Sequence, residues 1–233
     1  MQDLTGKRVL VTGGARRVGA AICHRFAAAG AAVIIHCRES RAEAEALAGS
    51  LPGSGHRVVA ADFADPAAVE ALIAALPEPP DYLINNASCY AREETPAFRD
   101  ACRQINVLAP VRLIRAFAAR GCESAVNLLD QAVLGPVAPD ETAYLGSRRE
   151  LARATEKLAL ELAPDCRVNG VAPGAVLPPA WLPESTMEKT ISTLPLRRAV
   201  SVEDLAEAVF FAAVNRSLTG ALLPVDCGQH LNL

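Results

Sequence analysis

The chain has 233 residues, and 51% of them are hydrophobic, 21% charged and 4% aromatic. This composition excludes a disordered chain and indicates a core built from many small aliphatic side chains. The formal net charge of −3 provides no basic field for nucleic acid or for an anionic membrane surface, so we expect neither as a partner.

Short apolar runs alternate with helical patterns along the chain. The apolar runs predict strands at residues 8–11, 32–36, 57–60, 82–85, 125–129, 167–171 and 221–225. The helical patterns predict helices at about 18–29, 41–51, 66–76, a long one ending near 120, 144–162 and 202–213. Gly30 is suited to cap the first helix, and the pair Ser201 and Asp204 is suited to open the last.

This alternation indicates an α/β fold, a Rossmann-type doubly wound parallel sheet with helices on both faces. No repeat or long polar linker divides the sequence, so we expect a single domain over residues 1–233. Ligands of such sheets bind outside the carboxyl ends of the strands, near the point where the strand order reverses. The candidate site is therefore sought at the strand ends.

A glycine-rich turn, Thr-Gly-Gly-Ala-Arg-Arg-Val-Gly, occupies residues 12–19 between the first strand and the first helix. Glycines let the backbone approach a pyrophosphate there, and the following helix offers unpaired N–H groups. A plain strand-to-helix loop is the alternative interpretation. The position of the turn favours a dinucleotide.

The end of the second strand, His-Cys-Arg-Glu-Ser at residues 36–40, lacks the acidic residue that an NAD ribose usually meets at that point. Arg16 and Arg38 are suited to flank a 2′-phosphate, which predicts NADPH/NADP as the cofactor. Glu39 opposes this prediction if it turns inward. Two solvated surface arginines are the alternative.

Further motifs lie at the other strand ends. In chain order they are Asp62, Asn85-Asn86-Ala87-Ser88, Asn106 with Ala109-Pro110, Asn127-Leu128-Leu129-Asp130, Tyr144, Pro173-Gly174, Thr219-Gly220 and Asp226-Cys227-Gly228. With the glycine-rich turn, these motifs make the chain resemble a short-chain dehydrogenase/reductase over nearly its whole length. Arg17, the Asn-Asn-Ala-Ser segment and Asp130, which stands where the wider family has a catalytic Ser, make it resemble the pteridine reductases in particular.

The resemblance implies an NADP-binding N-terminal half and a catalytic, substrate-binding C-terminal half. It implies cofactor contacts from Gly13, Arg16, Arg17, Val18, Gly19, His36, Arg38, Ser40, Asp62, Asn86, Ala87, Ser88, Tyr144, Arg148, Pro173 and Gly174. It implies substrate contacts from Arg17, Ser88, Tyr90, Asp130, Tyr144 and Trp181. The substrate it implies is a pterin or dihydropterin-like ring, on which Tyr90 stacks; a half-buried loop residue is the alternative for Tyr90.

Reduction by NADPH requires a proton donor beside the bond that accepts the hydride. Tyr144 is the phenol we expect in this role, and Arg148 lies one helical turn on, where its charge would bring the phenol's pKa toward working pH. The family has Lys at the position of Arg148. An arginine keeps its charge but cannot relay a proton, so a working enzyme, a slow enzyme and a catalytically impaired NADP-binding protein all stay open. Reduction of another carbonyl compound is a further alternative.

Asp130 helps reduction only in its protonated form, and the resemblance implies that it acts with Tyr144 as a proton source. A strand-end Asp that caps a loop is the alternative. Pro110 cannot donate to the carbonyl of Asn106, and in the wider family that carbonyl holds a water of the proton relay. A simple helix kink is nearly as good an explanation for Pro110.

Several expectations concern the rest of the chain. Residues 176–183 are expected to close over the substrate, with Trp181 either shielding the ring or covering a helix. Arg149 is expected to face solvent, and Cys227 to restrict the backbone where the family has Gly. The seven cysteines lack a Cys-x-x-Cys pair and the four histidines lack ligand spacing, so we predict neither a disulfide framework nor a metal site.

Two expectations concern the whole protein. The sequence shows no basic leader followed by an apolar stretch and no apolar run of roughly 18 residues, which predicts a cytoplasmic protein. The resemblance implies a homo-oligomer, a tetramer or a dimer, whose shared interface is formed by the long helices around Asn106 and Tyr144.

Overall fold

The structure is a computed structural model that describes residues 2–90, 94–137, 141–178 and 184–232. Seven strands lie in one parallel sheet in the order β3-β2-β1-β4-β5-β6-β7. The strands are β1 Arg8–Val11, β2 Ala32–Cys37, β3 Arg57–Ala60, β4 Tyr82–Asn85, β5 Ser124–Leu128, β6 Arg167–Pro173 and β7 Leu222–Val225. The predicted doubly wound sheet is confirmed, with the strand order reversing between β1 and β4.

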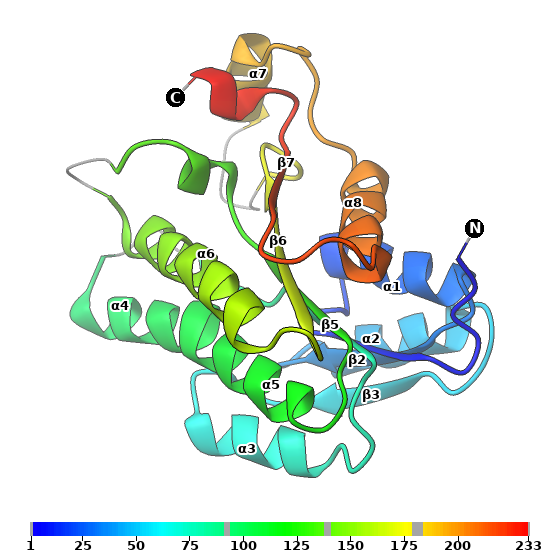
Figure 1. Cartoon of the computed structure of the whole chain (residues 1–233). Helices are drawn as coiled ribbons and strands as arrows, with labels where there is room; N and C mark the ends of the chain where they lie inside the picture. The colour runs from blue at the N-terminus through cyan, green and yellow to red at the C-terminus, as the bar shows by residue number, and fades with distance from the viewer. Residues whose placement is uncertain (1, 91–93, 138–140, 179–183, 233) are drawn as a thin grey trace.

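Helices cover both faces of this sheet (Figure 1). One face carries α1 Arg17–Ala28, α2 Arg41–Ser50 and α8 Val202–Val214. The other carries α3 Pro66–Ala74, α4 Pro96–Arg103, α5 Ala109–Ala118 and α6 Ala143–Glu161. The shorter elements are a π-helical turn η1 Gln104–Leu108, two 3₁₀ turns η2 Gln131–Leu134 and η3 Gln229–Asn232, and a helix α7 Glu184–Thr193.

The two larger of three apolar clusters lie one on each face of the sheet and hold the layers together. Val9 and Val11 face the cluster under α1 and α8, whereas Leu10 between them faces the cluster under α3, α5 and α6. All three side chains are fully buried, as expected when a parallel strand is covered on both sides. This is why the strands read as continuous apolar runs.

The predicted long helix before β5 is divided by the π-helical turn. Pro110 has no N–H, and the backbone N–H of Ala109 reaches back five residues to the carbonyl of Gln104. Proline therefore changes the helical ladder here without ending the helix. This π-helical turn therefore determines the position of Asn106 in the helix.

Helix α7 was not predicted, because its apolar residues form only a narrow stripe: Met187 and Ile191, with Leu194 just beyond the helix, recur at intervals of four and three residues among polar ones. It follows β6 and stands above the end of the sheet (Figure 1). Within the described part of the chain, no helix is both long and apolar enough to cross a bilayer.

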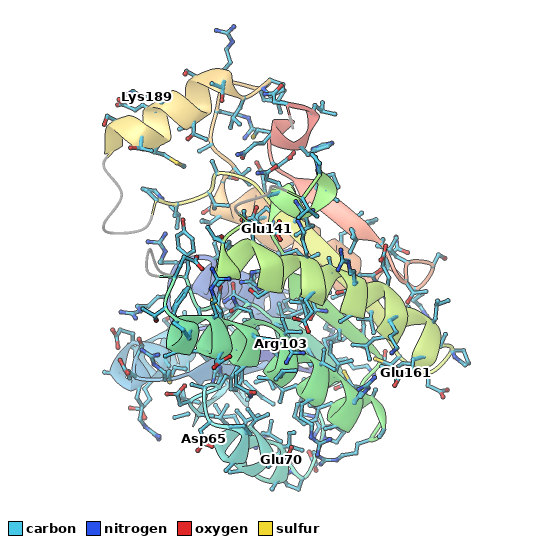
Figure 2. All side chains as sticks on the ribbon, turned by 90° about the vertical axis from the view of Figure 1, so that its left-hand side faces the viewer. Asp65, Glu70, Arg103, Glu141, Glu161 and Lys189 are labelled. Atoms are coloured by element: carbon cyan, nitrogen blue, oxygen red, sulfur yellow. The ribbon has the colours of Figure 1, made fainter. Side chains whose placement is uncertain are left out.

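The outward face of α4, α5 and α6 carries charged side chains that bridge neighbouring helices (Figure 2). Arg103 donates to Glu150 across α4 and α6 at 2.9 Å, and Arg115 donates to Glu161 across α5 and α6 at 2.8 Å. Such exposed pairs contribute little stability individually.

Candidate active site

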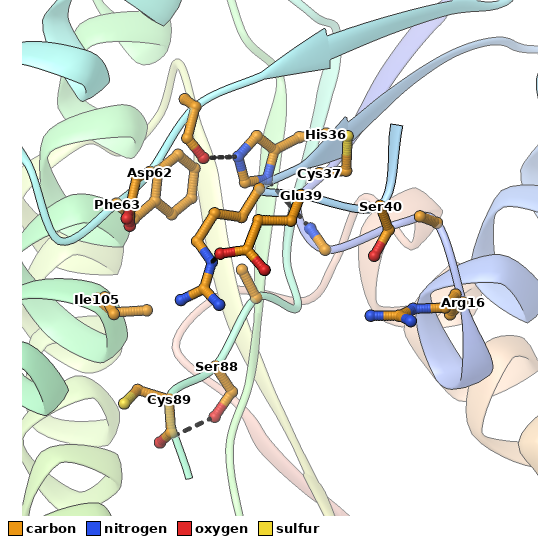
Figure 3. Close-up of a pocket in the computed structure, with 15 residues that line it drawn as sticks. Arg16, His36, Cys37, Glu39, Ser40, Asp62, Phe63, Ser88, Cys89 and Ile105 are labelled. Carbon is orange, nitrogen blue, oxygen red and sulfur yellow. Dashed lines mark hydrogen bonds and ion pairs between the residues drawn. The ribbon is translucent and has the colours of Figure 1, made fainter. Parts of the chain in front are cut away.

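A pocket of about 290 Å³ lies beyond the carboxyl ends of β1, β2, β3 and β4 (Figure 3). Eight of the residues predicted to bind the cofactor line it: Gly13, Arg16, His36, Arg38, Ser40, Asp62, Ala87 and Ser88. Arg16 and Ser40 stand on one side, and Asp62, Phe63 and Ile105 on the other. Phe63 and Ile105 also line this pocket. They were not predicted as site residues, because only the folding of the chain brings them there.

The glycine-rich turn is shaped by close backbone approach. Gly13 has φ +61°, and a Cβ there would lie 3.0 Å from the Cα of Ala87. A Cβ on Gly19 would lie 2.1 Å from the carbonyl oxygen of Gly13, so this glycine lets the first turn of α1 pack on the loop. Gly19 itself is not among the residues that line the pocket.

His36 connects the ends of three strands under the pocket. Its Nδ1 accepts from the backbone N–H of Gly13 at 3.2 Å, and its Nε2 lies 3.1 Å from the carbonyl oxygen of Ala61. These partners assign the proton to Nε2. The ring stacks on Phe63 with centroids 4.2 Å apart, and burial lowers the pKa of His36 to about 4. His36 is therefore neutral at physiological pH.

The charged residues at the pocket rim are exposed and paired with neighbours. Arg16 Nη1 lies 3.4 Å from Glu43, and Arg38 Nε lies 3.1 Å from Glu39. Because these pairs are solvated, a phosphate can compete with either carboxylate for the guanidinium. Glu39 pairs with Arg38 and also lines the pocket, which is the inward position that opposes the prediction of NADP.

A second cavity of about 840 Å³ lies beside the first, bounded by the ends of β4, β5 and β6 and by α7. Ten predicted site residues line it: Arg17, Val18, Asn86, Ser88, Tyr90, Asp130, Tyr144, Arg148, Pro173 and Gly174. Ser88 lines both cavities. Glu94, Met187 and Thr190 were missed; the last two belong to the helix that the sequence did not predict.

Tyr144, Asp130 and Arg148 form one cluster in the second cavity. The Tyr144 hydroxyl donates to Asp130 Oδ2 at 3.3 Å, and the Arg148 guanidinium carbon lies 5.3 Å from the centre of the Tyr144 ring. Arg148 is 3% exposed and donates from Nη1 to the carbonyl of Leu128 at 3.0 Å, while its buried Nε has no partner. Tyr90 packs against the Tyr144 ring nearly edge-on, with centroids 4.7 Å apart.

Burial controls the acidity of this cluster. It raises the pKa of Tyr144, and the charge of Arg148 opposes this shift without overcoming it. The expected net lowering of the Tyr144 pKa is thus wrong, because desolvation of the phenolate is the larger effect. Burial also raises the pKa of Asp130, against the N–H of Ala132 and the charge of Arg148. Both groups are shifted toward their protonated forms.

Helix α6 begins next to this cluster and is tied to the loop after β4. Thr142 caps the helix by accepting from the N–H of Leu145 at 3.3 Å, and both carboxylate oxygens of Glu94 lie 3.1 Å from the N–H of Ala143. Glu94 is also paired with Arg99 at 3.2 Å. These contacts position the residue that follows, Tyr144.

Asn106 lines neither cavity. Its side chain accepts from the N–H of Cys89 at 2.7 Å and donates to the carbonyl of Cys89 and to Ser147 Oγ at 3.1 and 2.9 Å. Through these bonds it joins the loop after β4 to α6. The water predicted at its carbonyl remains a prediction.

Arg149 does not face solvent, contrary to expectation. Its guanidinium pairs with Glu141 at 2.5 Å and donates to the carbonyls of Val133, Gly135 and Pro136. The loop after β5 folds over the side chain, so helical position alone did not determine exposure. Cys227 has φ +54°, a conformation that glycine adopts more easily, as its place in the motif suggested. Trp181 lies outside the described residues.

The protein family described as Enoyl-(Acyl carrier protein) reductase matches residues 13–230. The chain is 31% identical to L-xylulose reductase of Bos taurus over 241 residues, covering 97% of each protein. It is 31% identical to the oxidoreductase UcpA of Escherichia coli strain K12 over 258 residues, covering 99% of this chain and 97% of UcpA.

The fold also resembles that of a solved structure. The FolM alternative dihydrofolate reductase 1 of Brucella canis, crystallised with NADP, superposes with a TM-score of 0.88 at 34% identity, covering 98% of this chain and 95% of FolM. The chain belongs to the short-chain dehydrogenase/reductase family, a family of oxidoreductases.

Proposed function

We propose that this protein reduces a pterin or dihydropterin-like ring with NADPH. The observation that carries the proposal is the cluster of Tyr144, Asp130 and Arg148 in a cavity directly beside the glycine-lined pocket. The likeness to FolM, which is named as an alternative dihydrofolate reductase, supports the choice of substrate class.

The residues of the first pocket fit NADPH. Gly13 leaves the backbone room that a pyrophosphate needs, and the guanidinium groups of Arg16 and Arg38 with the Ser40 hydroxyl suit a 2′-phosphate. The unpartnered buried Nε of Arg148 offers a donor to a ribose hydroxyl. When bound, NADPH supplies the hydride.

Tyr144 and Asp130 handle the proton. Burial shifts the pKa of both the phenol and the carboxyl upward, which favours the protonated forms that can donate to a ring nitrogen as the ring is reduced. Arg148 stabilises the phenolate that forms, and its bond to the Leu128 carbonyl holds the guanidinium at the ring. Tyr90, Ser88 and Arg17 stand around the same cavity to orient the substrate.

The direct test compares kcat/KM for NADPH oxidation with dihydropterins, dihydrofolate, L-xylulose and simple dicarbonyls. We expect a dihydropterin to be the best substrate and Tyr144→Phe to lower its kcat by about a hundredfold or more. Asp130→Asn is expected to make the rate of NADPH oxidation fall less steeply as the pH rises. A carbonyl sugar with the highest kcat/KM contradicts the proposed substrate.

The second candidate is the reduction of another carbonyl compound, which the identity to L-xylulose reductase favours. The same phenol and guanidinium would serve that chemistry. Tight NADPH binding with no oxidation by any compound of the panel would instead identify an NADP-binding protein with impaired catalysis.

The assembly we propose is a homo-oligomer, a dimer or a tetramer, in which the face of α4, α5 and α6 is shared (Figure 2). Its Arg–Glu pairs, such as Arg103 with Glu150, can exchange partners between copies. Sedimentation of a monomer at all concentrations would contradict this part of the proposal.

A further inference from the structure

The backbone of Arg17 is strained. Its φ is +54°, and among the described residues other than glycine only Arg197 and Cys227 also have a positive φ. An L side chain in this conformation is crowded against its own backbone, whereas glycine is not. Strain of this kind persists where the surrounding structure uses the side chain.

The Arg17 side chain has two partners far away in the sequence. Its Nη2 donates to the carbonyl oxygens of Leu177 and Pro178, each at 3.0 Å. These two residues are the last described ones of the segment that leaves β6, and with Arg17 they line the larger cavity. A single guanidinium thus joins the glycine-rich turn to one wall of that cavity.

The beginning of the same segment is held by other parts of the chain. The N–H of Ala175 donates to Gln229 Oε1 at 3.1 Å, and the carbonyl of Ala175 accepts from Val200 at 2.8 Å. The Arg17 bonds lie two and three residues further on, at Leu177 and Pro178. Residues 175–178 are therefore anchored at one end by the C-terminal region and at the other by the turn that borders the cofactor pocket.

We propose that Arg17 is a positioning residue that fastens residues 177–178 to the glycine-rich turn, so that a cofactor that orders the turn also sets the wall of the substrate cavity. The inference takes from the proposed function only that NADPH binds at this turn. It explains why an arginine occupies a backbone position better suited to glycine.

The test uses Arg17→Gly, which removes the guanidinium and relieves the strained backbone together. We expect a higher Tm than the native protein, together with roughly tenfold faster hydrogen exchange at the amides of Val176 and Leu177. Saturating NADPH should slow exchange at these amides in the native protein and fail to do so in Arg17→Gly. A general structural role predicts the opposite sign for Tm.

The matched control is Arg41→Ala, which removes an exposed guanidinium that lines neither cavity. Arg41 pairs with Glu45 and has no contact with residues 177–178 among its described partners. At saturating NADPH this variant should keep the native exchange pattern. Unchanged exchange in Arg17→Gly, retained NADPH protection in that variant, or faster exchange across the whole chain would each overturn the proposal. If NADPH fails to bind even the native protein, the proposed function fails, while the comparison without NADPH still decides whether Arg17 fastens the segment.

Discussion

At the scale of single residues, desolvation outweighs neighbouring charge at the candidate site. Tyr144 lies beneath a guanidinium, yet burial still raises its pKa, and Asp130 shows the same balance. His36 is shifted in the opposite direction by the same cause, because burial disfavours its cationic form. Burial thus favours the uncharged form of each of the three groups, which suits a site that donates a proton beside a polyanionic cofactor.

His36 should make the protein acid-sensitive. Its pKa is lowered from 6.5 to about 4, so its stabilising contribution is complete above the unfolded value and is lost as pH falls from 6.5 to 4. Over that window we expect the native protein to lose on the order of 3 kcal/mol more unfolding free energy than His36→Gln, in which the group does not titrate. Urea unfolding of both proteins at several pH values measures the difference, and parallel curves would contradict it.

Arg148 is expected to act through its charge. Arg148→Met removes the charge that opposes the rise of the Tyr144 pKa, and we expect it to lower kcat by about a hundredfold. Arg148→Lys keeps a charge and should stay within about tenfold of the native rate. Steady-state kinetics with the best substrate decides, and a large gain in Arg148→Lys would instead show that the native arginine limits proton resupply.

At the scale of elements, the approach of α1 to the glycine-rich turn is what creates the pocket. The first turn of the helix rests on the carbonyl of Gly13, and His36 at the end of β2 accepts the N–H of the same residue. On the opposite face, Asn106 in the π-helical turn joins the loop after β4 to α6. Packing between elements, rather than any one element, therefore aligns the side chains.

Two glycine-to-alanine changes separate packing from helix propensity. Gly19→Ala places a methyl group 2.1 Å from the Gly13 carbonyl oxygen. We expect this substitution to lower the free energy of unfolding by about 3 kcal/mol or more and to weaken NADPH binding. Gly49→Ala, in α2, meets nothing within 4 Å and should stabilise by roughly 0.5 to 1 kcal/mol. Chemical unfolding measures both, and equal effects would mean that the tight contact at Gly19 is absent.

At the scale of the whole molecule, one sheet holds both cavities together. The first pocket draws on the ends of β1 to β4 and the second cavity on the ends of β4 to β6, so a ligand that bridges them contacts most of the sheet. Binding at such a site stabilises the native state as a unit.

We expect NADPH to raise the Tm of the whole protein more than NADH does, because the 2′-phosphate adds contacts with the arginines of the pocket rim. At a hundredfold excess over its Kd the gain is about 2.7 kcal/mol, on the order of 5 to 10 °C for a chain of this size. Arg38→Ala should bring the NADPH shift closer to that of NADH at equal concentration, because it removes one of the contacts for the 2′-phosphate. Thermal unfolding with each cofactor provides the measurement, and equal shifts in the native protein would remove the predicted preference.

Local signals were sufficient for much of the fold. The first, third and fourth strands were predicted to the residue, because each is a short, mostly apolar run bounded by turn residues. The predicted residues of both cavities also met, since the carboxyl ends of parallel strands share one edge of the sheet. Helix α7 was not predicted because its apolar residues form only a narrow stripe.

The sequence by itself determined the alternation of strands and helices, the family and the side chains that gather at the strand ends, since these depend on short-range pattern. Tertiary structure alone decided that Arg149 is enclosed by a loop, that Arg17 reaches residues 177–178, and that the Tyr144 pKa rises although a cation lies over its ring. Enclosure, distant hydrogen bonds and desolvation all depend on what the rest of the chain places around a side chain. That environment exists only after folding, which is why no pattern along the chain records it.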